Sequence, residues 1–180
     1  MNSENFNRRN YLRANFAPVL GVALGRTGFA AVAVGALSAC DAKPVPQSSF
    51  VLLDGTRLDS AALLGKVTLV NFWATSCVSC VAEMPALAEI HTELSPKGYD
   101  TIAVAMAYDP PAFVLNFAQS RKLPFKVAID NTGAVAKAWG DVKVTPTSYL
   151  VNKRGEIVKT YVGKPDMAAF KAEVLQLLAA

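Results

Sequence analysis

The sequence predicts an α/β domain built around a mixed sheet, on the basis of three observations. Apolar runs rich in β-branched residues occupy 67–73 and 101–107, as expected for strands buried on both faces. Helical segments separate these runs from each other and from the later strands. A hairpin-like pair of runs at 148–161 precedes apolar residues repeating every three to four positions at 167–178, which predicts a closing helix. Strands alternating with helices and ending in a hairpin favour a mixed sheet.

The other elements follow from turn and helix signals. Asp54-Gly55 lies between the short runs 50–53 and 56–58 and accepts the positive φ angles of a tight hairpin turn. Residues 77–94 have helical composition, although Pro85 interrupts them, and a proline and a glycine shortly afterwards end the helix. The remaining expectations are helices at 112–122 and 134–139, a strand at 125–129, and hairpin strands at 148–151 and 157–161. Since no repeat or boundary follows residue 50, residues 50–180 are expected to form one domain.

Composition and charge exclude several classes of protein. Hydrophobic residues make up 52% and charged residues 18% of the 180 residues, which excludes a disordered chain. The net charge is +4, but four arginines and one glutamate, a net of +3, lie within residues 1–39. The rest of the chain is therefore nearly neutral, and we expect no nucleic-acid partner.

The first 39 residues have the organisation of an export signal peptide. A basic head is followed by small apolar residues, and the uncharged run 27–39 has 13 residues, too few to span a bilayer comfortably. The segment ends in Leu37-Ser38-Ala39-Cys40, which resembles the lipobox of bacterial lipoproteins. That resemblance implies cleavage before Cys40 and attachment of lipid to it. The alternative is an uncleaved signal anchor formed by residues 14–39.

Further features near the leader suggest the route and the place of export. Residues 7–13 (NRRNYLR) resemble a twin-arginine motif, and an ordinary general-secretion signal is the alternative. Asp41 resembles the inner-membrane retention signal of some lipoproteins, which implies the periplasmic face of the inner membrane. Residues 40–49 contain two prolines and are expected to form a tether. Both routes end outside the cytoplasm, in an oxidising compartment.

The chemistry of the chain is expected at Cys77-Val78-Ser79-Cys80, where a buried strand gives way to a helix. The helix N-terminus favours an anion, so the pKa of the Cys77 thiol is expected below its ordinary value. The two cysteines can form a disulfide within one helical turn, with Cys77 exposed as the nucleophile and Cys80 one turn inward as the resolving thiol. A purely structural bridge is the alternative, although so short a loop adds little stability.

The sequence offers no motif for a cofactor or a metal. No histidine follows Cys80, which excludes covalent haem attachment at this pair, and no second CxxC pair is present for a structural zinc site. His91 is the only histidine and is expected on the surface of the helix. We therefore expect neither cofactor nor metal.

Three segments together resemble the TlpA-like/ResA-like branch of the thioredoxin family. They are residues 71–80 (NFWATSCVSC), residues 83–85 (EMP) and residues 144–149 (VTPTSY). The resemblance extends from Phe50 to the C-terminus and implies a thioredoxin fold with an N-terminal β-hairpin and an inserted strand–helix element around 102–129. Members of this branch are membrane-tethered extracytoplasmic thiol–disulfide oxidoreductases. They usually act as reductants, often in cytochrome c or copper-centre assembly, and a transmembrane thiol carrier recharges them.

The resemblance implies a role for each matched residue. Cys77 is the attacking thiolate and Cys80 the resolving thiol. Pro146, cis after Thr145, lies beside the disulfide, and the two residues present backbone groups to an extended substrate. Glu83 resembles the acidic residue beneath the disulfide, where a carboxylate with a raised pKa accepts the proton of the resolving thiol. The alternative for Glu83 is a solvated helix residue.

Other positions of the motif match less completely. Trp73 resembles the aromatic residue beneath the active-site loop and is expected to contribute to the substrate-binding region. Asn71 stands where plain thioredoxins have a buried aspartate, so Glu83 is expected to be the only acid near the site. Ser76 replaces a tryptophan common in the family, and Val78-Ser79 contains neither proline nor histidine. These departures leave the direction of electron flow open.

Three functions remain in competition. The leading one is a lipid-anchored disulfide reductase, whose partners are protein disulfide substrates, a transmembrane thiol reductant and the membrane. The second is an oxidant that donates its own disulfide. The third is a non-enzymatic Cu(I) carrier that uses the soft dithiolate of Cys77 and Cys80, with Met84 nearby.

Overall fold

A six-stranded mixed sheet forms the centre of residues 42–180, the part of the chain described by this computed structural model. The strand order is β1-β8-β7-β4-β5-β6, in which β4, β5 and β6 run parallel and the other pairs are antiparallel. The strands are β1 Lys43–Pro44, β4 Val67–Trp73, β5 Tyr99–Ala105, β6 Lys126–Ile129, β7 Thr147–Val151 and β8 Glu156–Val162. The predicted mixed sheet is confirmed.

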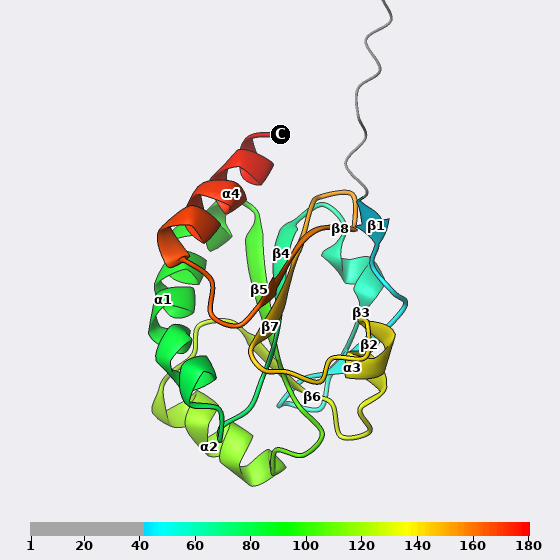
Figure 1. Cartoon of the computed structure of the whole chain (residues 1–180), viewed down its shortest axis with the longest axis vertical. Helices are drawn as coiled ribbons and strands as arrows, with labels where there is room; N and C mark the ends of the chain where they lie inside the picture. Colours follow the sequence, from blue (N-terminus) through cyan, green and yellow to red (C-terminus); the bar gives the residue numbers. More distant parts are fainter. Residues whose placement is uncertain (1–41) are drawn as a thin grey trace, which may run out of the picture. The chain divides into compact units, whose positions relative to one another are not determined.

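Helices cover both faces of the sheet (Figure 1). They are α1 Val78–Leu94, α2 Pro111–Ser120, α3 Ala134–Ala138 and α4 Met167–Ala179, with short 3₁₀ helices at Ser60–Leu63 and Ser95–Lys97. One face packs against α1, α2 and α4. The other packs against α3 and a separate hairpin of β2 Ser49–Val51 with β3 Arg57–Asp59. The predicted N-terminal hairpin and the inserted β5–α2–β6 element are both present.

Strand β4 shows how the sequence produces two cores. All seven of its residues are buried, so its sequence is apolar almost throughout rather than alternating. Leu69 and Trp73 contact the core beneath α1, whereas Val70 and Phe72 contact the core beneath α3. This division follows the two-residue period of a strand, and it places Asn71 on the α1 face.

The chain joins the sheet earlier than the predicted tether allows. Lys43 and Pro44 pair with β8, and the backbone N–H of Val45 donates to the carbonyl of Gly155 at 2.9 Å. The indole N–H of Trp139 donates to the hydroxyl of Ser48 at 3.0 Å. The predicted tether is therefore wrong from residue 43 onward. A two-residue edge strand held by backbone hydrogen bonds leaves no apolar pattern in the sequence.

The export features lie outside the described residues. These are the signal peptide at 1–39, the twin-arginine motif, Cys40 and Asp41. Among residues 42–180, none of the helices has the length and apolar character needed to cross a membrane.

His91 is buried, contrary to the prediction of a surface position. Only 9% of its surface is exposed, and its ring centroid lies 5.7 Å from that of Phe125 and 6.2 Å from that of Tyr99. Burial lowers the pKa of its imidazole. The prediction failed because the segment leading into β6 covers this side of α1, and a single helix pattern does not reveal which neighbours cover it.

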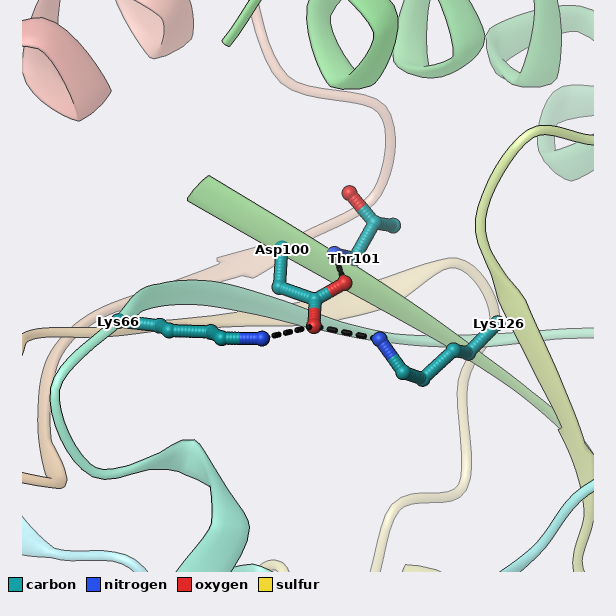
Figure 2. A network of polar contacts seen from close by, with 4 residues as sticks. All are labelled: Lys66, Asp100, Thr101 and Lys126. Atoms are coloured by element: carbon teal, nitrogen blue, oxygen red, sulfur yellow. Dashed lines mark hydrogen bonds and ion pairs between the residues drawn. The ribbon is translucent and has the colours of Figure 1, made fainter. Parts of the chain in front are cut away.

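A charged network lies where β4 and β5 begin, at the end of the sheet opposite the CxxC motif (Figure 2). Asp100 is 8% exposed, and its carboxylate accepts a hydrogen bond from Lys126 Nζ at 2.6 Å. Lys66 Nζ lies 3.5 Å from the same oxygen, and the backbone N–H of Thr101 donates to the other oxygen at 2.9 Å. Burial opposes ionisation, but the hydrogen bond and charge of Lys126 outweigh it and lower the pKa of Asp100.

Candidate active site

Cys77 and Cys80 form a disulfide at the start of α1, just beyond the carboxyl end of β4. Cys77 is the N-cap of the helix and is partly exposed, whereas Cys80 is completely buried. The backbone N–H of Cys80 points at Cys77 Sγ, with an N···S distance of 3.2 Å. After reduction, this N–H and the positive end of the helix dipole favour a thiolate on Cys77. The geometry therefore has one reachable sulfur and one protected sulfur.

Ser79, one of the residues that depart from the family pattern, lies next to the reachable sulfur. Its hydroxyl oxygen is 3.5 Å from Cys77 Sγ. Val78, the other residue between the cysteines, is 83% exposed and contributes an apolar surface at the disulfide. Of the two residues between the cysteines, Ser79 therefore places a polar group beside the sulfur and Val78 places an apolar side chain in solvent.

The loop before β7 forms the second half of the site. The Thr145–Pro146 peptide bond is cis, and the Thr145 carbonyl oxygen lies 3.5 Å from Cys77 Sγ. The hydroxyl of Thr147 donates to the carbonyl of Val144 at 2.7 Å, and the backbone N–H of Gly163 donates to the carbonyl of Pro146 at 2.8 Å. Thr145 is partly exposed, whereas Pro146 is buried. The structure thus brings Thr145 to the nucleophile and fixes its loop from both sides.

Glu83 is completely buried one helical turn after Cys80. Asn71 Nδ2 donates to Glu83 Oε1 at 2.9 Å and to the Ser148 hydroxyl at 2.9 Å. The second oxygen, Oε2, has no hydrogen-bond partner among the described residues. Burial raises the pKa of Glu83 to about 7, although the Asn71 hydrogen bond and the charge of Lys164 act in the opposite direction. Glu83 is therefore not the solvated helix residue that the sequence left open.

The sequence did not reveal the part that Asn71 plays at Glu83. It identified Asn71 only as the residue that replaces a buried aspartate. The signal was available in the period of β4, because Asn71 shares the α1 face with Leu69 and Trp73. A polar residue on a buried strand face needs a polar partner, and Glu83 is the acid on the facing helix.

Two predicted residues are too deeply buried for the contacts expected of them. Trp73 has no exposed surface, and its ring centroid lies 5.1 Å from that of Phe117. It packs under the active-site loop as expected, but it does not present a surface to a substrate. Met84 is 2% exposed within the same core. It is therefore not available as a surface ligand beside the dithiol.

The loop between β5 and α2 contributes two residues that sequence reasoning missed. Asp109 is 3% exposed, and its carboxylate accepts hydrogen bonds from the backbone N–H and the hydroxyl of Thr75, each at 2.6 Å. Tyr108 is 60% exposed, and its hydroxyl oxygen lies 3.3 Å from the hydroxyl oxygen of Thr145. The expectation that Glu83 is the only acid near the site is therefore wrong. The sequence carries no motif for Asp109 and Tyr108, because they reach the site only through the pairing of β5 with β4.

The arrangement suits two-electron sulfur chemistry. Among residues 42–180, no three histidine, cysteine or acidic side chains come together as a metal site. The groups that do converge are a dithiol pair and a carboxylate with a pKa near neutrality. A thiolate nucleophile, a resolving thiol and a proton acceptor are what thiol–disulfide exchange requires.

Known relatives share this chemistry. The chain is 35% identical over 158 residues to thiol-disulfide oxidoreductase ResA of Bacillus subtilis (strain 168), covering 87% of this chain and 86% of that protein. It is 34% identical over 159 residues to ResA of Halalkalibacterium halodurans, with 87% and 88% coverage.

Solved structures agree with the fold. A Neisseria meningitidis protein solved in solution and assigned as a thioredoxin superposes with a TM-score of 0.71 at 40% identity, covering 77% of this chain and 92% of that one. A thiol:disulfide interchange protein from Chlorobium tepidum superposes with a TM-score of 0.70 at 26% identity, with 76% and 97% coverage. Residues 41–175 match the Redoxin family. The chain therefore belongs to the Redoxin family, as a ResA-like thiol–disulfide oxidoreductase with a thioredoxin fold.

Proposed function

We propose that this protein is an extracytoplasmic disulfide reductase for other proteins, anchored at the periplasmic face of the inner membrane by lipid on Cys40. The observation that carries the proposal is the asymmetric disulfide, in which partly exposed Cys77 lies 3.5 Å from the Thr145 carbonyl and Cys80 is buried behind it. A transmembrane thiol reductant recharges the pair. Cytochrome c or copper-centre assembly is the setting that the resemblance suggests.

In the first step, the Cys77 thiolate attacks one sulfur of a substrate disulfide. A bond forms between Cys77 Sγ and that sulfur, the substrate disulfide breaks, and the other substrate sulfur leaves as a thiolate. The helix N-terminus and the N–H of Cys80 favour the attacking anion. The backbone of Thr145, a partly exposed residue beside Pro146, pairs with the extended segment that carries the substrate disulfide.

In the second step, Cys80 resolves the mixed disulfide. Its thiol passes a proton to Glu83, and the resulting thiolate attacks Cys77 Sγ. The second substrate thiolate leaves, so two electrons have moved to the substrate and Cys77–Cys80 is oxidised. The unpartnered Oε2 of Glu83 and the pKa of about 7 support this role, because a general base works best when its pKa is near the working pH.

Equilibrium with glutathione tests the direction of electron flow. We expect the Cys77–Cys80 pair to be strongly reducing and the reduced protein to reduce insulin. A potential in the range of extracytoplasmic oxidants, with no insulin reduction, would instead support the oxidant. Tight one-to-one Cu(I) binding without insulin reduction would support the carrier, although burial of Met84 argues against a third soft ligand there.

Trapping of mixed disulfides tests the substrate class. A Cys80→Ala variant should accumulate mixed disulfides with substrate proteins, and the matched Cys77→Ala variant should accumulate none.

Replacement of Cys40 by serine tests the lipid anchor. It should release the protein from the membrane and remove the lipid mass. A Cys40→Ser protein that stays fully membrane-bound at unchanged mass would favour the signal anchor.

A further inference from the structure

Asp109 is a buried acid for which the exchange reaction has no use. Both of its oxygens are occupied by Thr75, with Oδ2 accepting from the backbone N–H and Oδ1 from the hydroxyl, each at 2.6 Å. Thr75 stands two residues before Cys77 in the turn that the Cys77 N–H closes on the Ala74 carbonyl at 3.1 Å. Hydrogen bonds to a buried carboxylate are strong, so Asp109 fixes the loop that carries the nucleophile.

Its neighbour Tyr108 reaches the other half of the site. The tyrosine hydroxyl lies within hydrogen-bond distance of the Thr145 hydroxyl, at 3.3 Å, while the residue as a whole remains 60% exposed. Thr75 follows β4 and Thr145 precedes β7, so these two halves belong to separate loops. Two adjacent residues of the β5–α2 loop therefore contact both halves of the site, Asp109 through Thr75 and Tyr108 through Thr145.

We propose that Asp109 and Tyr108 are positioning residues that set the distance between Cys77 and the Thr145 backbone. The proposal rests on the proposed exchange with protein disulfides, in either direction. A protein substrate uses both halves of the site at once, the sulfur for attack and the Thr145 backbone for alignment. A small disulfide needs the sulfur alone. Loss of the positioning contacts therefore slows the protein substrate more than the small one.

The test compares two second-order rate constants of the reduced protein, one with insulin and one with glutathione disulfide. We expect Asp109→Asn to lower the insulin-to-glutathione ratio by about tenfold, because the Nδ2 that replaces one carboxylate oxygen cannot accept, so one of the two Thr75 hydrogen bonds is lost and the loop shifts. Tyr108→Phe removes one hydroxyl and keeps the ring, so the ratio should fall by about threefold to fivefold. The ratio cancels any loss of folded protein, which lowers both rates equally.

The chain offers a matched control for each variant. Asp130 is also 3% exposed and accepts a backbone hydrogen bond from Ala136 at 2.8 Å, beside α3 rather than α1. The Tyr161 hydroxyl donates to Glu173 at 2.6 Å, between β8 and α4. Asp130→Asn and Tyr161→Phe should leave the ratio unchanged whatever they do to stability.

A second pair of variants keeps the test decisive if Asp109→Asn does not fold. Thr75→Val removes only the hydrogen bond from the Thr75 hydroxyl to Asp109 and should lower the insulin-to-glutathione ratio by about threefold. Thr75→Ser keeps this hydrogen bond and should leave the ratio unchanged. An unchanged ratio in Asp109→Asn and Thr75→Val, or an equal fall in the control variants, overturns the proposal. An oxidising potential of the wild type would overturn the reductase assignment but not the positioning proposal. The two exchange rates can still be measured and compared in that case.

Discussion

Two buried carboxylates at opposite ends of the same sheet have opposite electrostatics. Glu83, beside the disulfide, is 0% exposed and receives one hydrogen bond from a neutral amide, that of Asn71. Asp100, at the other end, is 8% exposed and lies against Lys126 and Lys66 (Figure 2). The pKa of Glu83 rises to about 7, and that of Asp100 falls below its ordinary value.

The difference shows that the partner, more than burial, decides what a buried acid can do. A cation beside a carboxylate compensates for lost hydration, so Asp100 remains ionised and ties β5 to β6. A neutral amide compensates only in part, so Glu83 can exchange its proton near neutral pH. The chain uses the first arrangement for structure, and we propose that it uses the second for catalysis.

The largest expected effect is a loss of stability of the wild type, relative to Glu83→Gln, as the pH rises. The folded protein holds the Glu83 proton more tightly than the unfolded chain, where the pKa is near 4.5. This contribution is full below pH 4.5 and is lost as the pH rises through about 7. Relative to Glu83→Gln, the oxidised wild type should lose about 3 kcal/mol of unfolding free energy between about pH 4.5 and pH 8.5.

Denaturant unfolding of the two proteins at a series of pH values measures this difference. A comparison of the wild type with Asp100→Asn should show the opposite pH dependence. The lowered pKa of Asp100 stabilises the folded wild type above the ordinary pKa of an aspartate, and this stability is lost as the pH falls through the folded-state pKa. Parallel pH curves for the wild type and Glu83→Gln would show that Glu83 titrates normally.

The next effect is on turnover. Glu83→Gln keeps the size of the side chain but removes the base, so turnover at neutral pH should fall by about one to two orders of magnitude. The Cys77 pKa should also fall in this variant, because the substitution removes the negative charge of Glu83, which opposes thiolate formation on Cys77. Stopped-flow exchange across pH measures both quantities. Rates and a Cys77 titration equal to those of the wild type would leave Glu83 with no catalytic role.

Asp100→Asn should affect stability without affecting exchange. The variant leaves the amino groups of Lys66 and Lys126 without their anion, and these side chains are 50% and 36% exposed. Water screens them, so the expected loss is about 1–2 kcal/mol of unfolding free energy, with exchange rates unchanged. A slower exchange by the fully folded variant would mean that the two ends of the sheet are coupled.

The smallest effect concerns the amide beside Glu83. Asn71→Leu removes the hydrogen bond that lowers the Glu83 pKa, so that pKa should rise further, by about half to one unit. The pH midpoint of mixed-disulfide resolution should move upward by the same amount. Ser148→Ala serves as the control, because it removes the other acceptor of Asn71 and leaves its bond to Glu83. A midpoint that moves down in Asn71→Leu contradicts this account.

Much of the fold was predictable because the sheet is strongly patterned. The strand Val67–Trp73 has the predicted bounds, since an uninterrupted apolar run that ends near a CxxC motif leaves little choice. The elements around α2 and α3 differ from prediction by one or two residues at their ends. The edge strand at Lys43 was missed because its two exposed residues pair with β8 through the backbone and carry no apolar pattern.

The chemical core of the site was predictable and its support was not. Cys77 and Cys80 carry a motif that depends on neighbours in sequence, and their exposure agrees with prediction. The contacts of Glu83 and Asp109 come instead from residues 12 and 34 positions away, which only the folded sheet brings together. His91 failed for the same reason, because distant aromatic residues cover it.

The central claim is that Glu83 takes the proton of Cys80 during resolution, and single-turnover decay of a preformed mixed disulfide tests it most directly. A Cys77–glutathione mixed disulfide isolates the attack of Cys80 from the first step. The account predicts that the rate rises with an inflection near pH 7 in the wild type, following the Glu83 pKa, and that Glu83→Gln loses this inflection. The same pH profile in both proteins would contradict it.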